Sequence, residues 1–121
     1  MKKLLIADDQ AGIRSLVRMT LESDAYEILE AADGNQALAL AREHHPDIIL
    51  LDVMMPGQSG IDVCRALKAD PATATIQVVL LTAKAQDLDY REGKAAGADE
   101  YFTKPFSPVA LLEFVDQFMD G

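Results

Sequence analysis

The chain has 121 residues, of which 50% are apolar and 26% charged, a composition typical of one folded globular domain and not of a disordered or fibrous protein. With 20 acidic and 11 basic side chains, its formal net charge is −9. This charge disfavours a protein whose main task is to bind nucleic acid or an anionic membrane, and it favours cations or basic surfaces as partners.

Short apolar runs alternate with helical patterns along the whole chain. In chain order we expect a strand at 3–7, a helix with an apolar stripe from 13 to 21, a strand at 26–31, a helix at 34–44, a strand at 48–51, a helix at 60–67, a strand at 76–81, a helix at 86–96, a strand at 98–103 and a helix at 108–119. The first, third and fourth strands are rich in Leu, Ile and Val, which suits strands buried on both faces of a parallel sheet. The second and fifth are more polar and suit its edges.

Local signals mark the ends of several helices. Pro46 stops the second helix, Ser59 caps the third, Asp70-Pro71 ends the third, and Ser107 caps the fifth. The fourth helix has a poor apolar stripe, which predicts weak docking on the sheet. Five strand-helix units without a linker or repeat predict one five-stranded, doubly wound α/β domain over residues 1–121, with its site beyond the carboxyl ends of the strands.

The cysteine content and the N-terminal residues predict the compartment. Cys64 has no second cysteine for an internal disulfide, so we expect a reducing compartment, and its place in a helical apolar pattern predicts a small core residue. Only four apolar residues precede Asp8 after Lys3, too few for a secretory signal or a membrane span. The expected location is cytoplasmic.

The candidate site consists of the polar residues that follow the apolar runs: Asp8, Asp9, Asp52, Thr82 and Lys104. Alone, Asp9 is explained equally well as a helix cap. Together, three carboxylates about 4 Å apart repel by around 4 kcal/mol per pair at an effective dielectric near 20, so they need a cation or must hold protons. Oxygen donors without His or Cys favour Mg²⁺. Lys104 and Thr82 suit a phosphoryl group, which one carboxylate could accept as a nucleophile.

Four motifs occur in a fixed order: Asp8-Asp9, the stretch 50–57 (LLDVMMPG) followed by Gly60, Leu81-Thr82-Ala83, and the stretch 97–106 (GADEYFTKPF). With these motifs the chain resembles the receiver domains of two-component response regulators over essentially its full length. The resemblance implies a flavodoxin-like receiver fold with parallel strand order 2-1-3-4-5 and helices on both faces of the sheet.

The resemblance implies a metal-dependent phosphoacceptor. Asp52 would accept the phosphoryl group. Asp9, Asp52 and the backbone carbonyl of Met54 would bind Mg²⁺, for which Mn²⁺ can substitute, and Asp8 would act through metal-bound water. Chemically, such a site works mostly by positioning and electrostatics.

The resemblance also implies a switch around the phosphoryl group. Lys104 would contact that group and Thr82 would hydrogen-bond to it, while the small Ala83 would leave access for phosphate. Thr82 and Tyr101 would form the switch pair, and Lys104-Pro105 would be a cis peptide. The added charge would bias the surface of helix 86–96, strand 98–103 and helix 108–119.

The implied phosphate donor is a sensor histidine kinase or a histidine phosphotransfer protein. The protein would be a signalling receiver that assists its own phosphorylation and autodephosphorylation, not an enzyme on a separate substrate, and would not itself bind nucleic acid or membrane. Its last helix has only acidic charges, unlike members that dimerise by charge pairing. Arg91 or Lys94 could still pair with Glu113 or Asp116 of a second copy, so a phosphorylation-dependent homodimer stays open.

Three alternatives remain beside this interpretation. One is a receiver-like binding module that is never phosphorylated. Another is a small Mg²⁺-dependent phosphatase with an aspartyl nucleophile, but such enzymes have two acids two residues apart after the first strand, whereas Asp8 and Asp9 are adjacent. A flavodoxin-like electron carrier would need a Ser/Thr/Gly-rich phosphate loop at the same place. Arg14 is interpreted as an exposed helical arginine, and His44-His45 as a helix end without a metal.

Overall fold

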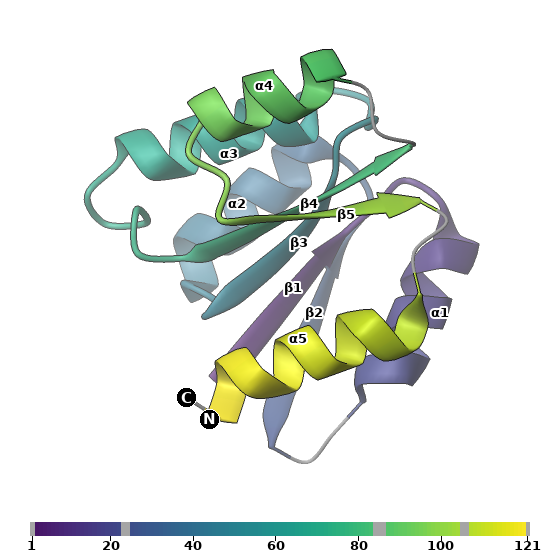
Figure 1. The fold of residues 1–121 in the computed structure, drawn as a ribbon. Coiled ribbons are helices and arrows are strands. Elements are labelled where there is room, and N and C mark those ends of the chain that lie inside the picture. Colours follow the sequence, from purple (N-terminus) through teal and green to yellow (C-terminus); the bar gives the residue numbers. More distant parts are fainter. Residues whose placement is uncertain (1, 23–24, 84–86, 105–106, 121) are drawn as a thin grey trace.

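The computed structural model describes residues 2–22, 25–83, 87–104 and 107–120, and at residues 82–83, 87–90, 104 and 120 it describes the backbone alone. Strands and helices alternate along the described chain (Figure 1). In order they are β1 (Lys2–Ala7), α1 (Ala11–Leu21), β2 (Tyr26–Ala31), α2 (Gly34–His44), β3 (Ile48–Asp52), α3 (Gly60–Ala69), β4 (Gln77–Ala83), α4 (Asp87–Ala95), β5 (Glu100–Lys104) and α5 (Pro108–Asp120).

The sheet is parallel and its strand order is β2-β1-β3-β4-β5, so the predicted doubly wound α/β fold is confirmed. The two polar runs form the edge strands β2 and β5, as expected. The central strands bury the segments 4–7, 48–51 and 78–81 completely. Continuous apolar runs are needed there because helices cover both faces of the sheet.

Successive residues of each central strand enter two separate hydrophobic cores. Leu5, Ile49 and Leu80 pack under α2 and α3, whereas their neighbours Leu4 and Leu50 pack under α1 and α5. Figure 1 shows α1 and α5 on one side of the sheet and α2, α3 and α4 on the other. Side chains in a strand alternate between faces, so one apolar run supplies both cores.

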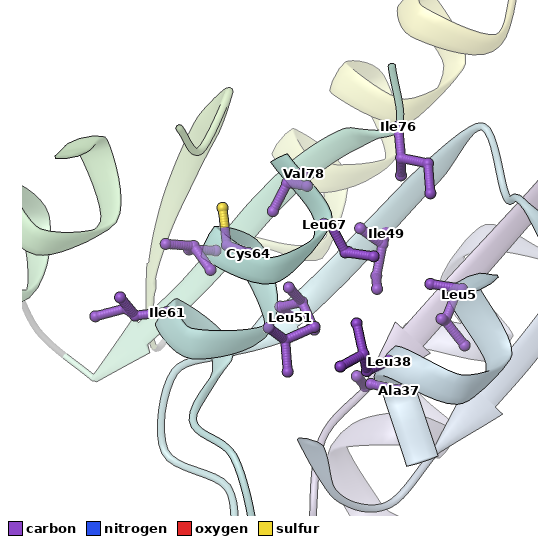
Figure 2. Close-up of a cluster of buried hydrophobic side chains, with 14 of the residues drawn as sticks. Leu5, Ala37, Leu38, Ile49, Leu51, Ile61, Cys64, Leu67, Ile76 and Val78 are labelled. Carbon is purple, nitrogen blue, oxygen red and sulfur yellow. The ribbon is translucent and has the colours of Figure 1, made fainter. Parts of the chain in front are cut away.

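Figure 2 shows the core under α2 and α3, in which Cys64 of α3 lies among aliphatic side chains. Cys64 is fully buried, and its thiol lies 3.7 Å from the carbonyl oxygen of Ala96. Burial raises the pKa of the Cys64 thiol from 9.0 to about 11, because the thiolate would lose its solvation. The prediction of a small core cysteine is confirmed.

The predicted helix caps and the predicted end of α2 are present. Ser59 accepts a hydrogen bond from the Asp62 amide at 3.1 Å, and Ser107 accepts one from Ala110 at 3.2 Å. α2 ends at His44, as the sequence predicts, and the next residue, His45, has a left-handed φ of 49°. The His45 amide donates to the carbonyl of Ala41, a common way to close a helix.

β5 begins two residues later than the apolar run predicts. Gly97, with a φ of 98°, closes α4 by donating to the carbonyl of Lys94, and only glycine adopts this backbone freely. The Asp99 carboxylate accepts a hydrogen bond from the Val78 amide at 2.8 Å, so residues 97–99 form the turn into the strand. Within α4, the described residues 91, 92, 94 and 95 are exposed and Gly93 is buried, in keeping with its poor apolar stripe.

Among the residues described, no helix is both long and apolar enough to cross a lipid bilayer.

Candidate functional site

Three carboxylates meet at the carboxyl ends of β1 and β3. Ala7 of β1 is in register with Leu51 of β3, so the residues that follow them, Asp8 and Asp52, are neighbours at one edge of the sheet. Asp9 is the next residue along. One carboxylate oxygen from each of Asp8, Asp9 and Asp52 lies within 4.8 Å of the other two. The predicted convergence of these three side chains is confirmed.

The cluster combines burial with like charge. Asp8 is fully buried and Asp52 is 5% exposed, whereas Asp9 is exposed to solvent. Like charges held this close repel, above all the two that are buried, and a divalent cation removes that repulsion. All three donors are oxygens, one side of the cluster is open, and Mg²⁺ prefers carboxylate and water ligands in such an arrangement. The donor set therefore fits a magnesium ion.

The segment that carries Asp8 is held at three points. Its amide donates to the carbonyl of Ala31 at the end of β2 at 3.1 Å. Its carboxylate oxygen Oδ1 accepts a hydrogen bond from the amide of Gln10 at 2.9 Å. Its carbonyl oxygen accepts one from Nη1 of Arg14 at 2.6 Å. The backbone and the side chain of Asp8 are thus both fixed by neighbours.

Asp52 is the last residue of β3, and the chain turns sharply after it. The amide of Met54 donates to Oδ1 of Asp52 at 3.3 Å, and the amide of Val53 donates to the carbonyl of Leu81 at 3.0 Å. A Cβ atom added at Gly60 would lie 2.3 Å from the carbonyl oxygen of Asp52. Only glycine permits α3 to begin this close to the end of β3.

The connection between β3 and α3 is docked on the N-terminus of α2. Pro56 accepts a hydrogen bond from the Gly34 amide at 3.3 Å, and the Gln58 side chain donates to Oδ1 of Asn35 at 3.0 Å. A Cβ atom at Gly34 would lie 1.8 Å from the carbonyl oxygen of Gln58. The segment that follows Asp52 is therefore also held in place by α2.

The remaining predicted residues of the pocket are placed by their backbones. Thr82 follows Leu81, the register partner of Asp52, and Ala83 is in register with Lys104 at the end of β5. The backbones of Thr82, Ala83 and Lys104 therefore lie at the same end of the sheet as the carboxylates. The side chains of Thr82, Ala83 and Lys104 lie outside the described part of the structure, as does Pro105, on which the cis-peptide prediction falls.

Tyr101, the predicted switch aromatic, lies in β5 and pairs with Leu80 of β4. It is half-buried and packs against the α2/α3 core. Its hydroxyl approaches α4 so closely that a Cβ atom at Gly93 would lie 2.0 Å from it. The ring therefore rests on α4 at the one buried residue among the described side chains of that helix.

Reasoning from the sequence missed Arg14. The sequence predicts an exposed helical arginine, but the Arg14 side chain is only 19% exposed and reaches the backbone beside the carboxylate cluster. Arg14 lies in the first turn of the helix that follows Asp8 and Asp9, and this position does not distinguish a residue that folds back on the loop from one that points to solvent.

The match to the response regulator receiver domain family covers residues 4–116. The phosphate regulon transcriptional regulatory protein PhoB of Pseudomonas aeruginosa is 47% identical over 111 residues, which are 92% of this chain and 48% of that protein. The transcriptional regulatory protein ResD of Bacillus subtilis is 47% identical over 91% of this chain and 45% of its own length. The chain thus spans about half the length of these curated relatives.

Solved structures agree with this match. A response regulator from Chloroflexus aurantiacus has a TM-score of 0.90 and 32% identity, covering 99% of this chain and 98% of its own. The chemotaxis protein CheY4 of Vibrio cholerae has a TM-score of 0.88 and 36% identity, covering 98% of each chain. The resemblance carried by the four sequence motifs is confirmed: this chain belongs to the family of response regulator receiver domains.

Proposed function

We propose that Asp52 accepts a phosphoryl group, with Mg²⁺ bound by Asp9, Asp52 and the carbonyl of Met54 and with Asp8 acting through metal-bound water. As a receiver domain of two-component signalling, the chain is a signalling protein and not an enzyme that turns over a separate substrate. The observation that carries the proposal is the approach of carboxylate oxygens from Asp8, Asp9 and Asp52 to within 4.8 Å at the carboxyl edge of the sheet.

The chemistry asked of Asp52 is nucleophilic. A carboxylate oxygen forms a bond to phosphorus while the phosphorus–nitrogen bond of a donor phosphohistidine breaks, and the electron pair of that bond stays on the imidazole. The hydrogen bond from the Met54 amide to Oδ1 of Asp52 limits rotation of the carboxylate. When bound, the metal supplies positive charge for the phosphoryl oxygens. Burial of Asp52 excludes most bulk water from the acceptor.

The groups on β4 and β5 complete the proposed pocket. Lys104 adds a second positive charge at the phosphoryl oxygens, Thr82 hydrogen-bonds to them, and the small Ala83 leaves room for the donor. Lys104-Pro105 in the cis form would aim the lysine into the pocket. Slow hydrolysis of the aspartyl phosphate by the same groups would be the autodephosphorylation step.

The phosphoryl group of an aspartyl phosphate carries nearly two negative charges, about one more than the Asp52 carboxylate that it replaces. Thr82 then moves toward them, Tyr101 takes the vacated space, and the surface of α4, β5 and α5 changes. Support comes from the contact of Tyr101 with α4 at Gly93.

The proposed phosphate donor is a sensor histidine kinase or a histidine phosphotransfer protein, and the proposed location is the cytoplasm. Pairing of Arg91 or Lys94 with the acidic α5 of a second copy remains part of the proposal.

The direct test incubates the protein with Mg²⁺ and acetyl phosphate and measures intact mass. We expect one added phosphoryl group, which is lost in Asp52→Asn and without metal. Asp62→Asn is the matched control, since Asp62 is an acidic residue on α3 that pairs with Arg65, away from the cluster. Incorporation in Asp52→Asn equal to that of the wild type would assign the phosphate elsewhere. A protein that binds Mg²⁺ but gains no group from acetyl phosphate or a kinase would be a binding module only.

A further inference from the structure

Arg14 connects the carboxylate cluster to the edge strand β2. Its Nη1 donates to the carbonyl oxygen of Asp8 at 2.6 Å, and its Nε lies 3.3 Å from Oε1 of Glu30. The Arg14 side chain is 19% exposed and that of Glu30 33%. A guanidinium group holds two acceptors at once in a fixed planar geometry, which a lysine ammonium does not.

The acceptor of this hydrogen bond lies in the peptide group that joins Asp8 to Asp9. Fixing its carbonyl fixes the plane of that peptide and so the relative directions of the two side chains. The amide of Asp8 is also bound to β2, through the carbonyl of Ala31. Ala31 and Glu30 are adjacent at the end of β2. The amide of Asp8 is therefore bound to this end of β2 directly, and the carbonyl of Asp8 is connected to it through Arg14.

Arg18 provides a comparison within the same helix. Its Nη1 lies 2.7 Å from Oε2 of Glu30, so both arginines share one carboxylate. Arg18 is 42% exposed, and among the contacts of the described residues it has none with Asp8. The two arginines therefore carry the same charge to the same partner and differ in the contact with the Asp8 backbone.

We propose that Arg14 is a positioning residue for the metal site, which orients the Asp8-Asp9 segment for Mg²⁺. This inference rests on the proposed function of the carboxylate cluster. Two effects of Arg14 oppose each other, because its positive charge repels a cation while its hydrogen bond orders the ligands. Glu30, which Arg14 shares with Arg18, offsets part of that charge at close range, and in our proposal the ordering of the ligands is the larger effect, so removal of Arg14 weakens Mg²⁺ binding. Removing an outer group that orients metal ligands typically reduces affinity 10–100-fold.

The test measures Mg²⁺ affinity by isothermal titration calorimetry on the full chain. We expect Kd to rise about tenfold in Arg14→Ala, near the lower end of that range because Arg14 holds a backbone carbonyl and not a ligand atom. Arg18→Ala should stay within about twofold of the wild type, because the metal-binding segment is untouched. The Kd of Arg14→Lys should lie between those of the two alanine variants, because a lysine ammonium does not hold two acceptors in the fixed planar geometry of a guanidinium group.

A second readout separates positioning from a general loss of structure. In phosphorylation by acetyl phosphate, the Mg²⁺ concentration for half-maximal rate should rise about tenfold in Arg14→Ala, while the rate at saturating Mg²⁺ should stay within about twofold of the wild type. Urea unfolding without metal shows whether each variant is folded. If Arg14→Ala is unfolded, Arg14→Lys and Glu30→Gln replace it in both measurements.

The outcomes are distinct from those of the proposed function. A wild-type protein that binds no Mg²⁺ contradicts the proposed function itself. A wild type that binds Mg²⁺, with Arg14→Ala and Arg18→Ala equal in Kd, contradicts the role of Arg14 alone. A tighter Kd in Arg14→Ala would also overturn it, because repulsion by the arginine charge would then outweigh the ordering of Asp8.

Discussion

At the scale of single residues, Cys64 shows how burial changes chemistry without creating a site. The thiol lies between α3 and the end of α4, beside the carbonyl of Ala96, and its pKa is raised to about 11, mainly by burial. The thiolate is the reactive form. The native protein should therefore react with thiol reagents only as fast as it unfolds.

The raised pKa of Cys64 predicts a loss of stability in alkaline solution. The unfolded chain loses the thiol proton near pH 9, whereas the folded chain keeps it until about pH 11. Stability from this group is therefore complete below pH 9 and is lost as the pH rises to 11, by about 2 kcal/mol. Urea unfolding of the wild type and Cys64→Ala at pH 8, 9, 10 and 11 would measure it.

Lysines also titrate in this range, but they do so in both proteins, so the difference in free energy of unfolding isolates Cys64. The wild type should lose more stability than Cys64→Ala as the pH rises. Parallel curves for the two proteins would contradict a buried, protonated thiol.

At the scale of elements, glycines report where two segments approach each other. Gly34 opens α2 against the carbonyl of Gln58, and no Cβ atom fits between them. At Gly12, in α1, no atom beyond the neighbouring residues and backbone of its own helix lies within 4 Å of the place where its Cβ would lie. Both are helical glycines in the sequence, and only the neighbouring element distinguishes them.

These two glycines predict opposite effects of the same substitution. Gly34→Ala should destabilise the fold by about 2 kcal/mol, because the backbone next to Asp52 must shift, and should also weaken Mg²⁺ binding. Gly12→Ala should stabilise it by about 0.5 kcal/mol, because alanine lowers the entropy of the unfolded chain. Urea unfolding with and without Mg²⁺ measures both. A neutral Gly34→Ala would show that the loop between β3 and α3 adapts freely.

At the scale of the whole molecule, charge opposes the compact state. The net charge is −9, and three of the acidic groups share one edge of the sheet. A ligand that binds only the folded state stabilises it by RT ln(1 + [L]/Kd), about 1.4 kcal/mol at ten times Kd. Mg²⁺ should therefore raise the melting temperature more than Na⁺ at the same ionic strength.

Asp9→Asn provides the sharpest version of this prediction. Without metal, the variant should be at least as stable as the wild type, because one repelling charge is removed. With Mg²⁺, the wild type should gain stability and the variant should gain little, so their order reverses. Thermal unfolding across a Mg²⁺ titration measures this, with Asp62→Asn as the control. Equal Mg²⁺ responses in all three proteins would mean that the ion acts only by screening.

Much of this architecture was predictable because it depends on residues close together in the chain. The apolar runs predict the central strands, Ser59 and Ser107 predict helix starts, and the polar runs predict the edges. The start of β5 differs from its prediction because it is set by the turn at residues 97–99, a backbone conformation that only the folded chain selects. Among site residues, Asp8, Asp9 and Asp52 were predictable because each comes at the end of an apolar run.

By itself, the sequence determined the alternation of strands and helices, the identity of the three carboxylates and the motifs that indicate a receiver domain. These features depend on side-chain type and on spacing over a few residues. Tertiary structure alone decided that Arg14 turns back and donates to the Asp8 carbonyl. It also decided that Gly34 packs against the segment after Asp52 and that Tyr101 packs against α4. Such contacts join residues far apart in the chain or depend on a choice of rotamer. They follow from strand register and from the close packing of one element on another, which no local pattern encodes.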